Sequence, residues 1–146
     1  MIILRIILDL RIAAWLVRSL SWLSKPARTW FRDAPPDVSG DWEQVWDSSS
    51  TGFSKDTDRH SNAKIYQFWR YCYAEFTAKG TRYCLFGHIR ENFLFGEWYP
   101  KKQEIGYFGA FKLRILADGE MTGVWLGHSQ KTVAINSDSW NWKKTQ

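Results

Sequence analysis

Two groups of side chains combine planar rings with positive charge on segments of alternating apolar and polar residues. Rings stack on bases, and cations attract phosphates, so these residue types in this pattern suit a nucleotide ligand. Within each group, the strands would present the residues on one face of a hairpin, since side chains alternate with a period of two. The predicted ligand-binding residues are Tyr71, Tyr73, His88, Lys112, Arg114 and Trp125.

A plainer interpretation of the second group stays open. Lys112 and Arg114 would simply point into water, while the opposite face of the same hairpin fills the protein interior. That interior would be lined by Phe111, Leu113, Val124 and Leu126. A barrel can be built with either face inward, so the sequence leaves the choice undecided.

The segment from 105 to 127 is the element around which we expect the fold to be organised. Two alternating runs flank Asp118-Gly119, a dipeptide that suits a two-residue type I′ turn. Folded about that turn, the opposite pairs would be Leu113 with Val124, Phe111 with Leu126, Ile115 with Thr122, Lys112 with Trp125, and Arg114 with Gly123. One face of this hairpin is then apolar, and the other carries the cations.

A second hairpin is expected about Lys79-Gly80. Its opposite pairs would be Glu75 with Cys84, Tyr73 with Phe86, and Tyr71 with His88. Cys72 then lies on the opposite face of the sheet from Cys84, so the two thiols cannot form a disulfide. Reduced cysteines favour the cytoplasm for this domain.

Short strands follow one another from Gly40 onward. We expect a bend near Arg70 within 63–78 and a bulge or turn across 136–139. Small-x-aromatic units recur at Gly40-x-Trp42, Gly96-x-Trp98, Gly106-x-Phe108, Gly109-x-Phe111 and Gly123-x-Trp125. The pattern predicts an all-β fold, a roughly eight-stranded antiparallel meander barrel; an open sheet or a sandwich is the alternative.

Residues 1–25 are predicted to form an N-terminal helix, followed by a proline-containing linker at 26–39 and the β-barrel ligand-sensing domain at 40–146. The helix is apolar but carries scattered arginines and an aspartate. Three interpretations remain: it spans or is embedded in a membrane, it lies on the membrane surface, or it packs on the sheet or a partner. The net charge of +5 suits an anionic partner.

No catalytic motif is visible in the sequence. It contains no phosphate-binding glycine loop, nucleophile elbow or His-Glu zinc motif. His60 and His88 show no metal-ligand spacing with the cysteines. We therefore expect neither an enzyme nor a metal or cofactor site. The absence of a block of basic residues argues against a nucleic-acid polymer as a partner.

The order of N-terminal apolar segment, linker and barrel resembles the β-barrel effectors of CBASS-type anti-phage defence, the SMODS-associated two-transmembrane β-strand-rich family. The stretches that carry the resemblance are Gly96-Glu97-Trp98, 106–111, Asp118-Gly119, 121–127 and Trp140-Asn141-Trp142. The resemblance implies a minimal eight-stranded barrel that binds a cyclic di- or oligonucleotide and then oligomerises and disrupts the inner membrane. This chain has one apolar N-terminal segment, not two.

These observations give a first functional hypothesis: a membrane-associated receptor-effector of the bacterial inner membrane, with its barrel on the cytoplasmic side. Its partners would be a cyclic nucleotide, the lipid membrane and further copies of the chain. The alternatives are a lipocalin-like carrier of a small apolar ligand, whose lumen the apolar face of the 105–127 hairpin would line, and a membrane-anchored structural interaction module.

Overall fold

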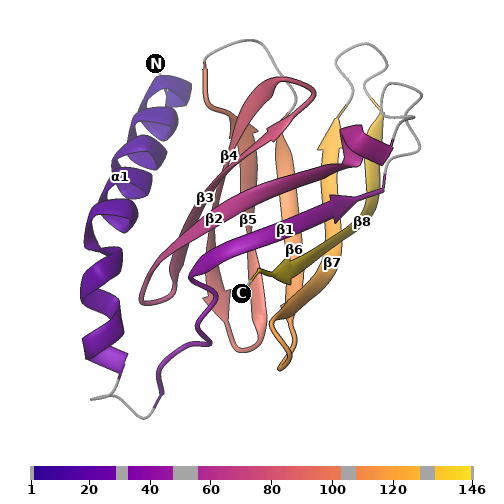
Figure 1. Ribbon diagram of the computed structural model, residues 1–146. Coiled ribbons are helices and arrows are strands. Elements are labelled where there is room, and N and C mark those ends of the chain that lie inside the picture. The colour runs from indigo at the N-terminus through magenta and orange to yellow at the C-terminus, as the bar shows by residue number, and fades with distance from the viewer. Residues whose placement is uncertain (1, 29–32, 48–55, 103–107, 129–133, 146) are drawn as a thin grey trace.

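The computed structural model describes residues 2–28, 33–47, 56–102, 108–128 and 134–145. Its elements in chain order are α1 (Ile2–Arg28), β1 (Gly40–Trp46), the 3₁₀-helix η2 (Asp56–Arg59), β2 (His60–Phe68), β3 (Tyr71–Ala78), β4 (Thr81–Arg90), β5 (Phe93–Pro100), β6 (Gly109–Ile115), β7 (Glu120–His128) and β8 (Ile135–Lys144). Every strand pairs antiparallel with the next, and β8 closes the sheet on β1 (Figure 1). The predicted eight-stranded meander barrel is confirmed.

The β3–β4 hairpin forms as its turn sequence predicts. Lys79 and Gly80 both have positive φ angles, 48° and 75°, which is the requirement of a type I′ turn. All three predicted cross-strand pairs of this hairpin are present in the structure. Cys72 and Cys84 are both buried and unbridged, and they belong to separate apolar clusters.

The register predicted for the β6–β7 hairpin is wrong by one residue. The loop contains three residues, because the Leu116 amide donates to the Glu120 carbonyl oxygen at 2.8 Å across it, and Gly119 has a φ of 71°. A three-residue loop with a left-handed glycine is an alternative closure to the two-residue turn. The observed pairs are Phe111 with Trp125, Lys112 with Val124, Leu113 with Gly123, Arg114 with Thr122 and Ile115 with Met121.

The slip changes the side of the sheet on which the β7 residues lie, because side chains alternate along a strand. Val124 and Leu126 are exposed on the outer surface. Trp125 instead packs against the core cluster, 6.3 Å from the ring of Trp98 between centroids. The predicted lumen lining is therefore wrong for Val124 and Leu126, and it holds for the buried Phe111 and Leu113.

Aromatic rings fill much of the barrel interior. Trp140 lies at their centre, with its ring centroid 5.7 Å from Phe76, 5.8 Å from Phe111 and 5.4 Å from Trp142. An eight-stranded barrel has an interior that side chains can fill. Glycine makes room for these rings: a Cβ atom on Gly127 would come within 2.9 Å of the Trp98 ring.

Of the two strand irregularities expected from the sequence, the one near Arg70 has the predicted position but is a full chain reversal, and the one at 136–139 is absent. The segment 63–78 is two strands, joined by a tight turn at Trp69-Arg70 in which Trp69 takes a left-handed φ of 53°. The turn contains no glycine, asparagine or proline, so no residue type signals it. Strand β8 pairs with β7 in one unbroken register from residue 135 to 143, without the predicted bulge.

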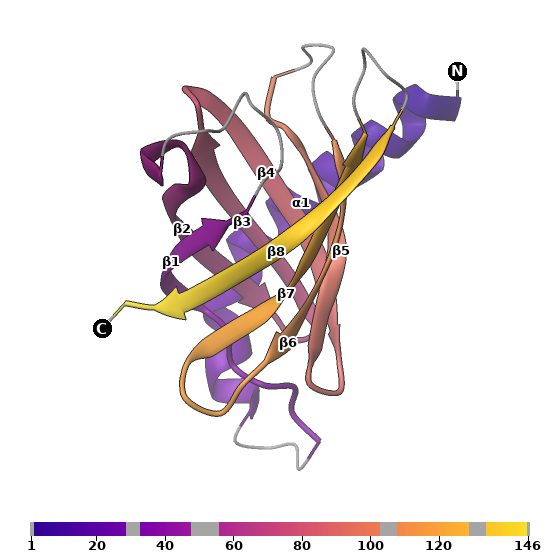
Figure 2. The ribbon, with the colours of Figure 1, turned by 90° about the vertical axis from the view of Figure 1, so that its right-hand side faces the viewer.

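The helix α1 lies along the outside of the barrel, against β2 and β3 (Figures 1 and 2). Ala14 and Val17 are buried there in a small cluster with Tyr73 and Cys84. The structure therefore shows the third of the three expected arrangements, in which the helix packs on the sheet. In the described part of the chain, no helix is both long enough and apolar enough to cross a bilayer.

The predicted linker is partly built into the barrel. The helix continues through Pro26 to Arg28, three residues beyond the predicted boundary. At the other end, Val38 is fully buried and its amide donates to the side chain of Gln67 at 2.9 Å. Trp42 donates its indole N–H to the Val38 carbonyl oxygen at 2.8 Å. The last linker residues therefore form part of the barrel core.

Candidate functional site

One row of residues crosses the outer surface of four neighbouring strands. Tyr71 on β3 pairs with His88 on β4, His88 with Phe95 on β5, and Phe95 with Lys112 on β6. In the adjacent row, Phe93 pairs with Arg114. We call these six residues the aromatic–basic face: Tyr71, His88, Phe93, Phe95, Lys112 and Arg114. Neighbouring strands are about 4.8 Å apart, so the longer row extends over about 14 Å.

The rings of the aromatic–basic face contact one another. His88 and Phe95 have centroids 4.0 Å apart, and Tyr71 lies 6.5 Å from His88. Tyr71 also stacks on Phe86 at 6.3 Å, with 18° between the planes. Tyr71 is 51% exposed, so part of its ring faces solvent.

The cations of this face are placed beside its rings. Lys112 holds its ammonium 4.7 Å from the centre of the Phe93 ring, a cation–π distance. Lys112 and Arg114 are both exposed, and neither forms an ion pair with a carboxylate among the described residues. Their charge is therefore available to an anion that lies against the rings.

Tyr73, another predicted ligand-binding residue, lies on the same outer face but is buried next to α1. Its hydroxyl donates to a Glu75 carboxylate oxygen at 2.7 Å and lies 3.4 Å from the Cys84 sulfur. Burial and these two hydrogen bonds raise the pKa of Tyr73. The ring thus supports the helix contact and is not presented to a ligand.

The Glu75 carboxylate joins three elements. It accepts hydrogen bonds from Tyr73 and from Lys101, whose ammonium lies 2.7 Å from one oxygen and 2.8 Å from the other, and it lies 3.6 Å from the Arg18 guanidinium of α1. Burial raises the pKa of Glu75, but the bonds from Lys101 and Tyr73 and the charges of Lys101 and Arg18 outweigh it and leave that pKa below its usual value.

Trp125 lies apart from the other predicted ligand-binding residues, because the corrected register turns it inward. Its indole N–H donates to the Asp47 carbonyl oxygen at 3.0 Å. The structure therefore brings together four of the six predicted residues on one outer surface, namely Tyr71, His88, Lys112 and Arg114. Their role in binding stays a prediction.

Sequence reasoning missed Phe93 and Phe95, which complete the face. The alternating side chains of β5 indicate their position, because Phe93 and Phe95 lie on the same side of the strand as the exposed Glu97. It was overlooked because the pairing of β5 with β4 and β6 depends on long-range closure, which alternation alone does not specify.

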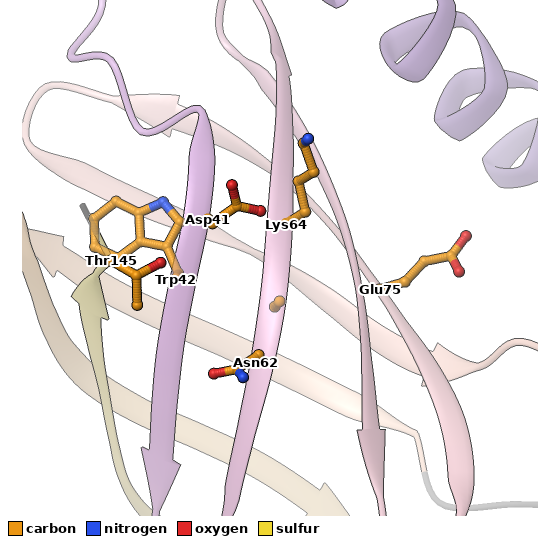
Figure 3. A pocket seen from close by; sticks show the side chains of 7 residues that line it. Asp41, Trp42, Asn62, Lys64, Glu75 and Thr145 are labelled. Carbon is orange, nitrogen blue, oxygen red and sulfur yellow. The ribbon is translucent and has the colours of Figure 1, made fainter.

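A second surface feature is an open groove of about 330 Å³ over β1, β2 and β3 (Figure 3). It is lined by Asp41, Trp42, Asn62, Ala63, Lys64, Glu75 and Thr145. Its lining includes two carboxylates and one lysine, so the groove suits an anionic ligand less well than the aromatic–basic face does. Within the described ranges, no three His, Cys, Asp or Glu side chains are placed to hold a metal ion.

Comparison with known proteins does not identify a family for this chain. No protein-family model matches the chain, and no curated protein matches its sequence.

Proposed function

We propose that this protein is a receptor for a small anionic ligand that carries planar rings, and that it binds this ligand on the aromatic–basic face. The observation that supports the proposal most directly is the row from Tyr71 through His88 and Phe95 to Lys112. Stacking on rings and pairing with cations are the two interactions by which proteins hold nucleotides without a sequence-specific pocket.

A nucleotide is the ligand class that fits both parts of this surface. Its bases would lie on the exposed Tyr71 and neighbouring rings, and its phosphates would meet Lys112 and Arg114. Cyclic di- and oligonucleotides are the first members of the class to test, because the resemblance to CBASS-type effectors implies one. In that wider proposal, bound ligand promotes self-association of the chain at a membrane.

The barrel interior supports an apolar carrier less well. Seven buried aromatic residues occupy it: Trp42, Trp46, Phe76, Trp98, Phe111, Trp140 and Trp142. Two of the four residues expected to line a carrier lumen, Val124 and Leu126, lie on the outer surface.

The proposal is tested by titrating the full chain with cyclic dinucleotides and following its melting temperature, which a ligand specific for the folded state must raise. The Lys112→Ala/Arg114→Ala double variant should bind at least about tenfold more weakly, because charge-assisted contacts contribute about 1.5–3 kcal/mol each. An Arg82→Ala/Lys143→Ala variant removes the same net charge from exposed positions elsewhere and should bind as the parent does.

Equal weakening by both double variants would show that only overall charge matters, and would contradict a site on the aromatic–basic face. Tyr71→Ala should weaken binding while the melting temperature without ligand changes little, since that ring is half exposed. Binding that tightens with the length of a single-stranded oligonucleotide would replace the small ligand by a polymer.

A further inference from the structure

The helix α1 has apolar side chains on two opposite faces. Its inner face, with the buried Ala14 and Val17, packs on the barrel. Its outer face carries large apolar side chains that are exposed: Ile12, Trp15, Leu16, Trp22 and Leu23. Trp15 and Trp22 are 66% and 69% exposed and lie seven residues apart, so they are aligned along the helix.

These residues form one continuous stripe. With 3.6 residues per turn, positions 12, 15, 16, 19, 22 and 23 lie on the same side of a helix, and Ser19 is the one polar residue among them. A helix whose only contact is the barrel would be expected to carry charged residues on this side. A contiguous exposed apolar surface of this kind marks an interaction site.

Positive charge borders the stripe. Arg11 and Arg18 lie one above the other along one edge of the stripe, both exposed. On the barrel beside the helix, Lys64 and Arg18 both approach the Tyr66 ring, and Arg11 donates to the Lys101 carbonyl oxygen at 3.4 Å. The carboxylate in contact with this border, Glu75, is already paired with Lys101 and Arg18.

We propose that α1 is a surface anchor that lies flat on an anionic lipid membrane, between the bilayer and the barrel. The tryptophans of the stripe enter the headgroup region, where an amphipathic ring is best accommodated, and the bordering cations meet anionic headgroups. This inference supplies the membrane contact of the wider proposal above. It concerns a different surface from the aromatic–basic face, so failure of nucleotide binding would not affect it.

The helix is expected to lie along the membrane and not to cross it. A crossing helix would have to leave the barrel, exposing Val17 and separating Arg18 from Glu75. No described helix has the length and apolarity needed for a span. A second copy of the chain is a less suitable partner than lipid, since its own stripe carries the same positive border and offers no complementary charge.

The experiment uses the full chain and two kinds of vesicle, one of phosphatidylcholine alone and one that also contains phosphatidylglycerol. We expect the protein to float with the anionic vesicles, and added salt to weaken this binding. The Trp15→Ser/Trp22→Ser variant should lose at least about tenfold in partitioning while keeping the parent's melting temperature, because both rings are exposed.

A Val124→Ser/Leu126→Ser variant is the matched control. It removes two exposed apolar side chains from the outside of β7 and should float as the parent does. Absence of binding to anionic vesicles by the folded parent, or equal losses in both variants, would overturn the proposal. So would a parent dimer in solution that the tryptophan substitutions dissociate, because the stripe would then be a self-association surface.

Orientation is measured with a fluorescent label on single cysteines introduced as Ile12→Cys and Leu23→Cys, since both native cysteines are buried. A helix lying flat places both labels at the same shallow depth, so an external reductant of the label should quench both equally. Protection of one label and not the other would show that the helix crosses the bilayer, and would overturn the flat arrangement.

Discussion

The side chain of Gln67 connects three segments inside the barrel. Its amide oxygen accepts from the Val38 N–H at 2.9 Å, and its amide nitrogen donates to the carbonyl oxygens of Pro36 and Trp69 at 3.0 and 2.8 Å. The residue is 1% exposed, so each of these groups depends on a protein partner. Gln67 therefore holds the end of the linker onto the barrel.

Gln67→Leu should lower the free energy of unfolding by about 2–4 kcal/mol, because it leaves buried backbone groups without partners. Urea denaturation measures this loss. Asn62→Leu, which also replaces a side-chain amide by leucine but at an exposed position of the same strand, should shift the midpoint little. Equal midpoints for the two variants would show that water replaces the Gln67 bonds.

Individual site residues could be placed from the sequence only where the turn was assigned correctly. Gly80 suits the second position of a two-residue turn, and the pairing of Tyr71 with His88 predicted from that turn is confirmed. Trp125 is predicted beside the cations because Asp118-Gly119 suits a two-residue turn, whereas the structure closes this hairpin with a three-residue loop. One residue of loop length decides whether that ring faces a ligand or the core.

At the scale of strands, the alternation of side chains and the turn residues predict how many strands the barrel has and in what order they pair. They do not predict where each strand begins and ends. The β2–β3 turn at Trp69-Arg70 has no residue that favours a turn, and the segment appeared as one bent strand. Hydrogen bonds of Gln67 to the Trp69 carbonyl oxygen and of Ile89 to the Arg70 carbonyl oxygen accompany this turn. Tertiary contacts of this kind cannot be derived from local sequence.

Two glycines are required for different reasons: Gly96 because another strand lies too close for a side chain, and Gly80 because of its left-handed backbone conformation. At Gly96, an added Cβ would lie 2.1 Å from the Phe86 carbonyl oxygen and 2.5 Å from the Gly87 Cα, so the backbone of β4 would have to move. Gly96→Ala should therefore cost about 3 kcal/mol or more. Gly80 has a left-handed φ of 75° with open space around it, and Gly80→Ala should cost about 1 kcal/mol. Thermal denaturation compares the two; a larger loss at Gly80 would contradict the packing of β4 on β5.

At the scale of the whole molecule, one of the contacts between α1 and the barrel involves a charge that titrates, since Arg18 lies 3.6 Å from the Glu75 carboxylate. The pKa of Glu75 is lowered in the folded protein, so its contribution to stability is present above the usual carboxyl pKa. That contribution is lost as the pH falls through the folded value. The attachment of the helix should weaken in acid.

Glu75→Gln should reduce stability by about 1–2 kcal/mol at neutral pH, because it removes the charge that Lys101 and Arg18 contact. Its stability should also change less than the parent's between neutral pH and the acid range in which the parent loses the Glu75 contribution. Urea midpoints measured across that range test this. Parallel pH profiles for parent and variant would show that Glu75 does not carry the acid sensitivity.

The closure of β1 on β8 brings the two ends of the barrel segment together. The Thr145 amide donates to the Asp41 carbonyl oxygen at 2.9 Å, and Lys144 lies opposite Trp42. The C-terminal end of β8 accordingly lies beside the start of β1 (Figure 1). A short peptide could therefore join residue 145 to residue 40, with new termini opened at the Lys79-Gly80 turn. Such a circular permutant would keep every strand neighbour and release α1 from the chain, because the ring of strands has no obligatory starting point. It would be less stable than the parent, since it also lacks the buried Val38 and the Gln67 bonds to Pro36 and Val38.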